Sequence, residues 1–521
     1  MTRILIADSL DPSGLSLFRE AGVEVHQLTA EERPRLPEIL ADYEALVVRS
    51  STQVTADLMK AGKKLKVVGR AGIGVDNVDV AAATELGILV VNAPTANLMS
   101  ATEHTFALLL SLARRVPEAD ASTKAGEWNR KLTGVELQGK TLGIIGFGRI
   151  GQRVADRARG FEMKILAYDP FLDTAAARKL DVELLPLDDL LARADAITFH
   201  TPLTKESRNL LNRERIARMK KGALVVNCGR GGVIDEEALL EALESGHLGG
   251  AALDVFAEEP PKDLRLVRHK KVVATPHLGA QTVEAQERIS IETAQMVLAA
   301  LSGSLAVAAV NLPFRPTGGR AEPFMALGET LGRMAGGLLG GPFQRLQVDV
   351  SGIDEALCAP VAVAVLKGVL TPFMGDDVNY VNAEQIAKAR GIEVVRSVRS
   401  APGEYPNLVD IALSGGDRSV KLAGTVFGDH DLRVVRFEDY PLEFRPEGKL
   451  LVMENHDRPG VVGKIGTLLA EADVNIADIP LARRGQAALA VLRLDQEPTP
   501  ELVEKLAGLP EVKSARRVLL G

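Results

Sequence analysis

Short apolar runs alternate with amphipathic stretches along the N-terminal part of the chain. Runs of this length predict buried strands, and apolar positions at helical spacing predict helices between them. In residues 1–97 the expected strands are 3–8, 22–27, 44–49, 65–69 and 88–92. Residues 98–280 repeat the pattern, with expected strands at 141–145, 163–168, 194–199, 222–227, 249–253 and 271–275. This alternation predicts two Rossmann-like, doubly wound parallel sheets of the α/β class, with ligands at the carboxyl ends of the strands.

The segment that follows is expected to return to the first sheet. A long helix is predicted from Thr282 to Leu301, and a strand from Ala306 to Val310. Residues 1–97 and 287–311 would then form one discontinuous domain, and residues 98–286 a second domain between its parts. The alternative is that the returning segment only extends the second domain.

Prolines and glycines mark two boundaries in the rest of the chain. Pro313, Pro316 and Gly318-Gly319 predict a linker. A further α/β unit is expected at 317–443, with strands Leu346–Val350 and Ser419–Phe427 and a helix Asn382–Ala389. After Pro446 and Gly448, residues 449–521 follow the order strand, helix, strand, strand, helix, strand, which predicts a small antiparallel sheet.

Composition excludes several classes of protein. Hydrophobic residues make up 46% and charged residues 25%, which is typical of a soluble globular chain. The net charge of −7 argues against a general nucleic-acid or membrane-surface role, which needs a basic face. Cys228 and Cys358 lie far apart and form neither a disulfide nor a metal-binding pattern, so we expect no metal and a reducing cytoplasm. The uncharged run Thr293–Phe314 contains too many polar residues for a membrane span.

One Gly-rich turn carries the most specific local pattern in the chain. The expected strand 141–145 runs directly into Gly146-Phe147-Gly148-Arg149-Ile150-Gly151, and helical spacing continues from Arg149 to Phe161. The glycines at 146, 148 and 151 suit a tight turn, close approach of a pyrophosphate and close helix–strand packing. The helix N-terminus would favour the anionic pyrophosphate. A Gly-rich turn in a non-binding sheet is the alternative.

The acid after the next strand favours one cofactor. The strand Met163–Tyr168 ends on Asp169, at about the spacing expected between a Gly-rich turn and a ribose-binding carboxylate. Such a carboxylate accepts hydrogen bonds from a ribose diol and repels a 2′-phosphate. We therefore predict that the cofactor is NAD and not NADP.

Polar residues that suit hydride transfer follow later strands of the second sheet. Arg230, Glu259 and His277 each come shortly after a strand, so they should meet at its carboxyl edge. A His can take or return a hydroxyl proton, a carboxylate beside it raises its pKa, and a guanidinium can hold a substrate carboxylate. Glu258 competes with Glu259, because spacing cannot choose between them, and Arg230 could be only an ion-pair residue.

Other candidate residues in this region have simpler interpretations. His104 lies on a helical stretch and is expected to be packed. His200 precedes Thr201-Pro202 and suits a turn that lines a cofactor. Cys228 has no adjacent base, so a small packing residue is the better interpretation than a thiol nucleophile.

The first sheet should bind the anionic groups of a substrate. Arg49-Ser50 ends one strand, and Arg70-Ala71-Gly72-Ile73-Gly74 ends another. Two arginines with the backbone amides of a Gly turn suit a phosphate or a carboxylate, and solvated arginines are the alternative. Trp128-Asn129-Arg130-Lys131 follows a helical stretch at 103–126, and this excursion could bring a base to the cleft of a neighbouring subunit.

These stretches together resemble the D-isomer-specific 2-hydroxyacid dehydrogenase family, and within it the D-3-phosphoglycerate dehydrogenases. The matching segments are 69–77, 146–151, 227–235, 253–260 and 275–280. The resemblance implies that Arg230, Glu259 and His277 are the catalytic residues, which favours Glu259 over Glu258. It implies a Trp128–Lys131 segment that crosses a dimer. The cofactor contacts that it implies are Arg149, Ile150, Asp169, Thr201, Cys228, Gly229, Arg230, Asp254, His277, Leu278, Gly279 and Ala280.

The C-terminal part is similar to the long form of the same enzymes. Residues 317–443 resemble their intervening domain, with Val378-Asn379-Tyr380-Val381-Asn382-Ala383 as the best match. Residues 449–521 resemble a ferredoxin-like ACT regulatory domain. In serine-inhibited relatives an amino acid binds between two such domains, and Asn455, Asp457 and Asn475 match the binding positions. At the first two the side chains differ from the His and Asn of the best-known bacterial type, which leaves the effector open.

The resemblance implies NAD-linked oxidation of 3-phospho-D-glycerate to 3-phosphohydroxypyruvate, the first step of L-serine biosynthesis. Arg49, Ser50, Arg70 and the Gly72–Gly74 turn would bind the substrate, together with Arg130 or Lys131 of a partner subunit. A cytoplasmic homo-oligomer, dimer or tetramer, with an amino-acid effector is expected. The alternatives are another D-2-hydroxyacid dehydrogenase, a 2-oxoglutarate reductase, or a non-catalytic NAD-sensing protein of the corepressor type.

Overall fold

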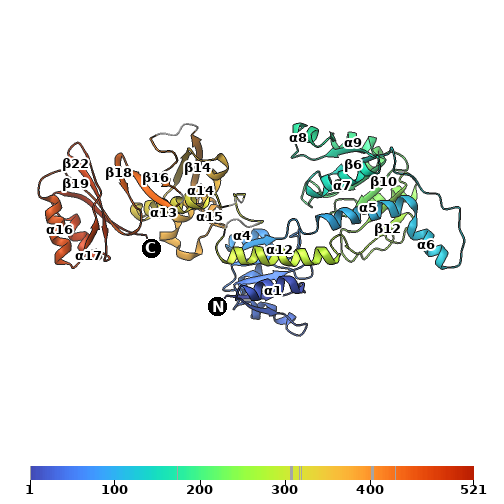
Figure 1. The fold of residues 1–521 in the computed structure, drawn as a ribbon, viewed down its shortest axis with the longest axis horizontal. Coiled ribbons are helices and arrows are strands. Elements are labelled where there is room, and N and C mark those ends of the chain that lie inside the picture. The colour runs from blue at the N-terminus through green and yellow to red at the C-terminus, as the bar shows by residue number, and fades with distance from the viewer. Residues whose placement is uncertain are drawn as a thin grey trace.

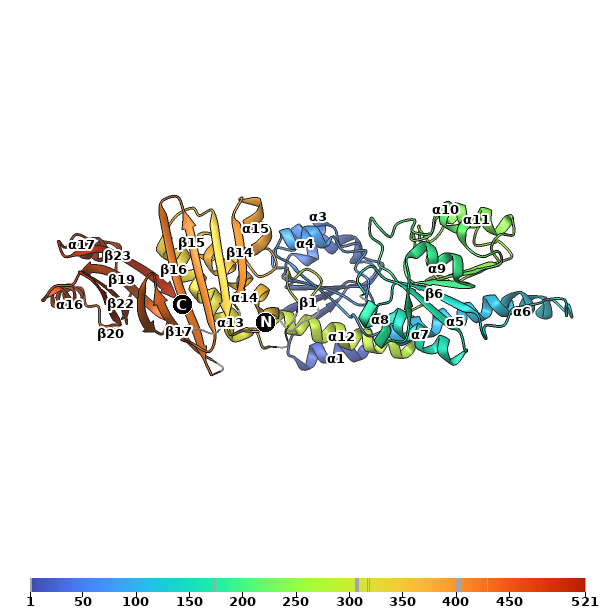
Figure 2. The same ribbon diagram turned by 90° about the horizontal axis from the view of Figure 1, so that it is seen from above.

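The computed structural model describes residues 2–520 except 173, 305–308, 316, 318, 400–403 and 429. Four units, each with its own sheet, follow one another along the long axis of the molecule (Figures 1 and 2). The unit that contains the N-terminus lies between the unit of the Gly-rich turn and the two C-terminal units. The expected α/β class is confirmed, with two parallel-sheet units, a mixed-sheet unit and a small antiparallel unit.

The first sheet is parallel and has the strand order β2-β1-β3-β4-β5. Its strands are β1 (Arg3–Ile6), β2 (Glu24–Gln27), β3 (Ala45–Val48), β4 (Val67–Arg70) and β5 (Leu89–Asn92). The covering helices are α1 (Pro12–Glu20), α2 (Leu36–Leu40), α3 (Ala56–Ala61) and α4 (Val80–Glu85), with a 3-10 turn η1 (Arg33–Arg35). All residues of β3 are buried, as a short apolar run in a parallel sheet requires.

The helix α12 (Val283–Leu301) returns from the second unit and packs against α1, β4 and β5. The Ser290 hydroxyl donates to the carbonyl of Asp11 at 2.8 Å, and Gly14 leaves the space for this close approach. Of the strand expected at Ala306–Val310, residues 306–308 lie outside the described residues. Ala309 forms a single antiparallel bridge to Val91. The long helix therefore contributes to the first unit, as an apolar face that covers its sheet.

The second sheet is parallel and has the order β12-β11-β10-β9-β6-β7-β8, in which the direction of strand order reverses at β6. Its strands are β6 (Thr141–Ile145), β7 (Lys164–Tyr168), β8 (Glu183–Leu184), β9 (Ala196–Phe199), β10 (Leu224–Asn227), β11 (Gly250–Leu253) and β12 (Val272–Ala274). The helices are α5 (Leu98–Arg114), α6 (Val116–Lys124), α7 (Arg149–Gly160), α8 (Thr174–Lys179), α9 (Leu187–Arg193), α10 (Arg213–Arg218) and α11 (Glu236–Glu244). The Gly-rich turn follows β6, at the position where such sheets bind ligands.

In this unit one local prediction was wrong and one short strand was missed. The single helical stretch at 103–126 is divided into α5 and α6 at Arg115, which has a φ of 53°. Pro117 lies in the first turn of α6, where its missing N–H is tolerated, whereas inside one continuous helix it would break a hydrogen bond. The two-residue strand β8 was not predicted, because a pair of residues carries no periodic signal.

The third unit contains a mixed sheet of order β14-β13-β15-β16-β17-β18, in which only β13 and β14 pair in parallel. Its strands are β13 (Arg345–Ser351), β14 (Glu393–Arg399), β15 (Leu408–Gly415), β16 (Arg418–Phe427), β17 (Asp431–Phe437) and β18 (Tyr440–Phe444). The helices α13 (Glu322–Leu339), α14 (Cys358–Met374) and α15 (Ala383–Ala389) accompany two 3-10 turns, η2 (Glu355–Leu357) and η3 (Gly375–Asp377). Among the described residues, the segment Glu355–Met374 is long and apolar enough to cross a membrane, but 67% of its most apolar 18-residue window is buried inside the protein, where α14 packs on α13.

The last unit is an antiparallel sheet of order β20-β22-β19-β23, with β21 also on β22. Its elements are β19 (Gly448–His456), α16 (Val461–Glu471), β20 (Ile476–Asp478), β21 (Leu481–Arg484), β22 (Ala487–Leu494), α17 (Pro500–Ala507) and β23 (Val512–Leu520). One expected strand is split into β20 and β21 around Pro480, which has no N–H for the ladder. One face of the sheet packs on α16 and α17, while Leu450, Val491 and Val518 on the other join the core of the third unit.

Candidate active site

The three glycines of the turn after β6 meet different surroundings. Gly146 has a φ of 90°, and its N–H donates to the carbonyl of Tyr168 at 2.8 Å. A Cβ on Gly146 would lie 2.7 Å from the carbonyl carbon of His200, and one on Gly151 would lie 2.3 Å from the carbonyl oxygen of Gly146. A Cβ on Gly148 would have no neighbour within 4 Å among the described atoms. The fold thus requires Gly146 and Gly151 to be small, whereas Gly148 only leaves open space.

Asp169 and Thr201 border this turn. The Asp169 carboxylate accepts the N–H of Phe147 and the N–H of Phe171, each at 2.9 Å, which fixes it beside the Gly-rich turn. The buried Thr201 hydroxyl has no hydrogen-bond partner among the described residues. Burying a hydroxyl without a partner costs free energy, so an orphaned donor beside an open turn suits a ligand that supplies the missing bond.

Arg149, at the start of α7, also belongs to this region. It donates from Nη1 to the carbonyl of Pro94, at 3.2 Å, in the segment between the first two units. Ile150 packs against the core beside β6.

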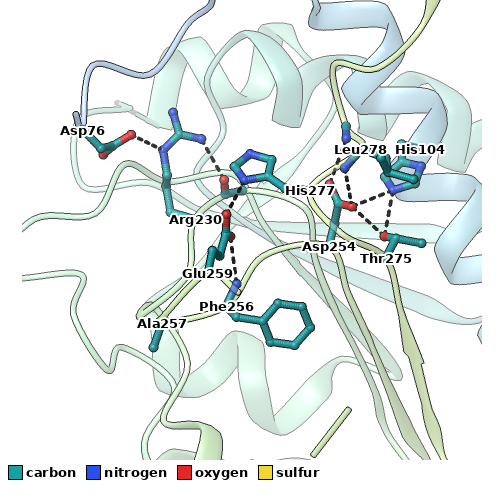
Figure 3. Close-up of polar contacts among 12 residues, drawn as sticks. Asp76, His104, Arg230, Asp254, Phe256, Ala257, Glu259, Thr275, His277 and Leu278 are labelled. Carbon is teal, nitrogen blue, oxygen red and sulfur yellow. Dashed lines mark hydrogen bonds and ion pairs between the residues drawn. The ribbon is translucent and has the colours of Figure 1, made fainter. Parts of the chain in front are cut away.

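Glu259 and His277 are brought together at the carboxyl edge of the same sheet. His277 Nδ1 lies 2.8 Å from Glu259 Oε2, and Glu259 Oε1 accepts the N–H of Phe256 at 3.1 Å (Figure 3). Half of the His277 side chain is exposed, at 50%. By contrast, Glu258 forms an exposed ion pair with Lys262. Of the two carboxylates that spacing could not separate, only Glu259 contacts the imidazole.

This contact changes the acidity of both groups. The hydrogen bond to Glu259 raises the pKa of His277 above its ordinary value, although partial burial opposes the shift. Burial disfavours the charged form of Glu259, but the hydrogen bond and the charge of His277 outweigh it and hold the pKa of Glu259 below its usual range. The pair therefore stabilises an imidazolium beside a carboxylate.

A second imidazole–carboxylate pair lies behind the first. The buried carboxylate of Asp254 accepts the N–H groups of Leu278 and Gly279 at 2.7 and 2.9 Å and the Thr275 hydroxyl at 2.6 Å. His104 Nε2, from α5, lies 3.1 Å from the same carboxylate (Figure 3). The prediction that His104 is only packed was incomplete, because helical periodicity shows that a residue faces inward but not which polar group it meets.

Arg230 connects the two parallel sheets. Its Nε donates to Asp76 Oδ2 at 3.0 Å, across from the loop that follows β4, and its Nη1 donates to the carbonyl of Gly229 at 2.8 Å. A Cβ on Gly74 would lie 2.1 Å from Arg230 Nη2, so the guanidinium rests directly on the Gly72–Gly74 turn. The guanidinium lies beside His277 (Figure 3). Asp76 was not singled out from the sequence, although it lies within one of the family-like stretches.

Arg70 lies under the same turn. A Cβ on Gly72 would lie 1.7 Å from Arg70 Nη1, and the buried Arg70 Nε has no partner among the described residues. Burial and the nearby Arg230 guanidinium lower the pKa of Arg70 to about 10, so it still carries its charge at neutral pH. The guanidiniums of Arg70 and Arg230 therefore both lie against the Gly72–Gly74 turn, and Arg70 has an unused N–H donor.

The loop that carries Arg49 and Ser50 is shaped by a buried acid. Asp8, at the end of β1, accepts the N–H of Arg49 at 2.7 Å and the hydroxyls of Ser51 and Thr52 at 2.6 and 2.9 Å. Arg49 lies close enough to Arg70 for its positive charge to lower the pKa of Arg70 further. Sequence patterns did not identify Asp8, because the residues that it contacts lie 25 to 44 positions away along the chain.

The expected substrate residues Arg130 and Lys131 lie on an exposed segment of the single chain. The Trp128 side chain is 83% exposed, and Arg130 and Lys131 beside it are exposed as well. Helix α6, which leads into this excursion, projects from the end of the second unit that is remote from the first unit (Figure 2). Any role of these residues in substrate binding therefore requires another subunit.

Cys228 and the expected effector residues occupy simpler environments. Burial raises the pKa of the Cys228 thiol to about 12, which fits a packing residue and not a thiolate. Asn455, at the end of β19, is buried, Asp457 is exposed and lies 3.5 Å from Arg483 Nε, and Asn475 donates to Asp495 Oδ2 at 2.6 Å. These contacts leave the effector positions partnered inside their own unit.

Comparisons with known proteins agree with this layout. Residues 106–279 match the NAD-binding domain of the D-isomer specific 2-hydroxyacid dehydrogenases. Residues 320–438 match the D-3-phosphoglycerate dehydrogenase intervening domain, and residues 449–511 match the ACT domain. The third and fourth units thus have the expected identities, and the last unit is an ACT domain.

Full-length relatives cover all four units. The chain is 42% identical to a D-3-phosphoglycerate dehydrogenase of Methanocaldococcus jannaschii, over 98% of this chain and 99% of the relative. It is 39% identical to one of Bacillus subtilis, over 99% of both chains. Among solved structures, a D-lactate dehydrogenase of Aquifex aeolicus complexed with NAD and lactic acid is 30% identical, with a TM-score of 0.53 over 58% of this chain and 96% of that chain.

Proposed function

The chain belongs to the D-3-phosphoglycerate dehydrogenase family, and from this premise we propose that it oxidises 3-phospho-D-glycerate at C2 to 3-phosphohydroxypyruvate, with NAD as hydride acceptor. This reaction is the first step of L-serine biosynthesis. The single observation that carries the proposal is the His277–Glu259 pair beside Arg230 at the carboxyl edge of a dinucleotide-type sheet.

The residues around the Gly-rich turn fit NAD. Gly148 leaves open space where a pyrophosphate would approach the start of α7, and the orphaned Thr201 hydroxyl can supply a hydrogen bond. Asp169 would accept hydrogen bonds from a ribose diol and repel a 2′-phosphate. The other proposed cofactor contacts are Gly146, Arg149, Ile150, Gly151, Cys228, Gly229, Arg230, Asp254, His277, Leu278, Gly279 and Ala280. When bound, NAD supplies the carbon that accepts the hydride.

The geometry of His277 assigns its two nitrogens different tasks. In the neutral ring Nδ1–H donates to Glu259, which leaves the lone pair on Nε2 available as a base. Nε2 removes the C2 hydroxyl proton as the C2–H bond breaks and its electron pair departs as hydride, so that the alcohol becomes a ketone. Glu259 stabilises the imidazolium that forms, and the same imidazolium returns the proton in the reverse direction.

Different arginines would bind the two negatively charged groups of the substrate. Arg230 would hold the carboxylate next to the reacting carbon, because its guanidinium lies beside His277. Arg49, Ser50, Arg70 and the Gly72–Gly74 turn would bind the phosphate, and the unused Nε of Arg70 is a donor for it. Arg130 or Lys131 would join them from a partner subunit. The proposal therefore requires a homo-oligomer, either a dimer or a tetramer.

Regulation is inferred from the C-terminal unit, and the location from the class of enzyme. The ACT domain supports binding of a small-molecule effector, with serine as the first candidate and Asn455, Asp457 and Asn475 as the residues that would bind it. A soluble metabolic enzyme of this kind would work in the cytoplasm.

An NADH absorbance assay tests the activity. Purified protein should oxidise NADH in the presence of 3-phosphohydroxypyruvate, and slower with glyoxylate, pyruvate or 2-oxoglutarate, which lack a phosphate for Arg49 and Arg70. Faster turnover of 2-oxoglutarate than of 3-phosphohydroxypyruvate would show that the proposed substrate is wrong. Tight NADH binding without turnover of any of these 2-oxo acids would favour the non-catalytic, NAD-sensing alternative.

A further inference from the structure

The turn that carries His277 is held in an unusual conformation. His277 has a φ of 56°, in the left-handed region that residues with a side chain rarely adopt. Its own N–H donates to the carbonyl of Asp254 at 2.9 Å, and the next two N–H groups donate to the Asp254 carboxylate. A single residue at the end of β11 therefore determines the path of the chain through the base.

The Asp254 carboxylate is in turn held by side chains. It is fully buried, and a buried carboxylate costs much free energy unless it is paired and hydrogen-bonded. Thr275, directly after β12, donates to Oδ1, and His104 approaches the same oxygen from α5. His104 Nε2 also lies 3.2 Å from the Thr275 hydroxyl oxygen, so one imidazole N–H is shared between the two groups.

His104 is the only one of these partners that comes from another structural layer. Asp254 follows β11, and Thr275 and the 277–279 turn follow its neighbour β12, whereas His104 lies on the helix α5, which packs against both strands. The Ser100 and Thr282 hydroxyls, 2.8 Å apart, further tie α5 to the start of α12. The His104 imidazole thus connects α5, through the Asp254 carboxylate, to the turn that carries His277.

We propose that His104 is a positioning residue for the reaction: its Nε2–H fixes the Asp254 carboxylate, and Asp254 fixes the backbone turn that aims His277 at the substrate. This inference rests on the proposed function for its reaction, but not for its geometry. His104 does not reach the reacting atoms itself. Its effect should therefore appear in the rate of the chemical step and in binding of the cofactor that the turn borders, not in capture of the substrate phosphate.

Two substitutions separate positioning from packing. His104→Leu keeps an apolar side chain of similar size but removes the donor to Asp254. His104→Gln keeps an amide N–H that can reach the same oxygen. We expect His104→Leu to lower kcat about tenfold, because small misplacements of a catalytic group are costly, and to leave the KM for 3-phosphoglycerate within about twofold. His104→Gln should recover most of the wild-type kcat.

The matched control is His247→Leu. His247 precedes β11 at the opposite, amino-terminal edge of the sheet, where its Nε2 donates to the carbonyl of Ile216 at 2.9 Å. The His247→Leu variant should leave kcat unchanged. Thr275→Val removes another donor to the same Asp254 oxygen and should lower kcat in the same way as His104→Leu, which keeps the test available if the leucine variant does not fold.

The kcat values of the variants are interpreted together with their unfolding temperatures and with the dissociation constant of NADH, which is measured by fluorescence. A kcat loss in His104→Leu with rescue by His104→Gln and an unchanged unfolding temperature supports positioning. Wild-type kcat in His104→Leu, or equal losses in both variants with lower unfolding temperatures, overturns it. If the wild type does not oxidise 3-phosphoglycerate, the proposed function fails on that assay alone. Weaker NADH binding in His104→Leu but not in His104→Gln would then still support the positioning role, and equal binding in both would reject it.

Discussion

The two parallel sheets reverse their strand order at β1 and at β6, and the turns after these two strands are filled in opposite ways. After β6, Gly148 faces open space beside a helix N-terminus. After β1, the buried Asp8 carboxylate accepts hydrogen bonds from Arg33, from the Arg49 N–H and from two hydroxyls. We propose that the open turn after β6 binds a pyrophosphate, and that the loop held by Asp8, which carries Arg49, binds a compact anion.

On the proposed mechanism, this difference divides the reaction between the two units. The second unit carries the proposed base, its carboxylate and the proposed cofactor contacts, and the first unit carries the proposed phosphate ligand Arg70 and the Gly72–Gly74 turn. Arg230 spans the boundary through its contact with Asp76. Variants of the second unit should therefore change kcat or NAD binding, and variants of the first should change the KM of the phosphorylated substrate.

The largest effect is expected for His277→Ala. Loss of the proposed general base should lower kcat about a thousandfold, because a positioned acid–base group contributes on this order. The dissociation constant of NADH, measured by fluorescence titration, should change little. Undiminished turnover of 3-phosphoglycerate by this variant would remove His277 from the mechanism and, with it, the division of labour between the two sheets.

Glu259→Gln should lower kcat about a hundredfold, in the lower part of the range for acid–base groups. Oxidation requires neutral His277, so the wild-type rate should rise with pH through the pKa of His277, which the hydrogen bond to Glu259 raises. Without the carboxylate that raises this pKa, the rise should occur at lower pH, and a pH–rate profile of kcat measures the shift. Glu258→Gln, next to it in sequence but paired with Lys262 at the surface, is the control and should match wild type.

Arg49→Ala combined with Arg70→Ala tests the other unit. The double variant should raise the KM for 3-phosphoglycerate by about tenfold or more, because each charged hydrogen bond to an anion contributes a few kcal/mol at most. NADH affinity should not change. Arg35→Ala, in an exposed pair with Glu38, is the control for loss of positive charge. An unchanged KM in the double variant would assign the phosphate to other residues.

The smallest effect is expected for Gly148→Ala. Its methyl group meets no neighbouring atom, so the unfolding temperature should equal that of wild type while NADH affinity falls about threefold through crowding of the pyrophosphate. Gly151→Ala should instead lower the unfolding temperature, because its methyl group would collide with the carbonyl of Gly146. Equal unfolding temperatures in both variants would contradict the different roles of these glycines.

The local patterns of this sequence determined the order of units, nearly all strands of the two parallel sheets, and the Gly-rich turn. Such features depend on alternation and spacing within a few residues, which the chain displays directly. The prediction of one helix over 103–126 was wrong at Arg115, where one left-handed residue redirects the chain. The apolar helix α14 was not predicted, since a helix buried on all sides shows no periodicity.

Only the tertiary structure decided which side chains meet. Glu258 and Glu259 are neighbours in sequence, yet one faces solvent and the other the imidazole, because the turn after β11 directs adjacent side chains to opposite sides. The contacts of Arg230 with Asp76 and of Asp254 with His104 join residues about 150 positions apart. Sequence periodicity records whether a residue faces the interior, whereas the partner it meets there depends on how separate strands and helices are brought together.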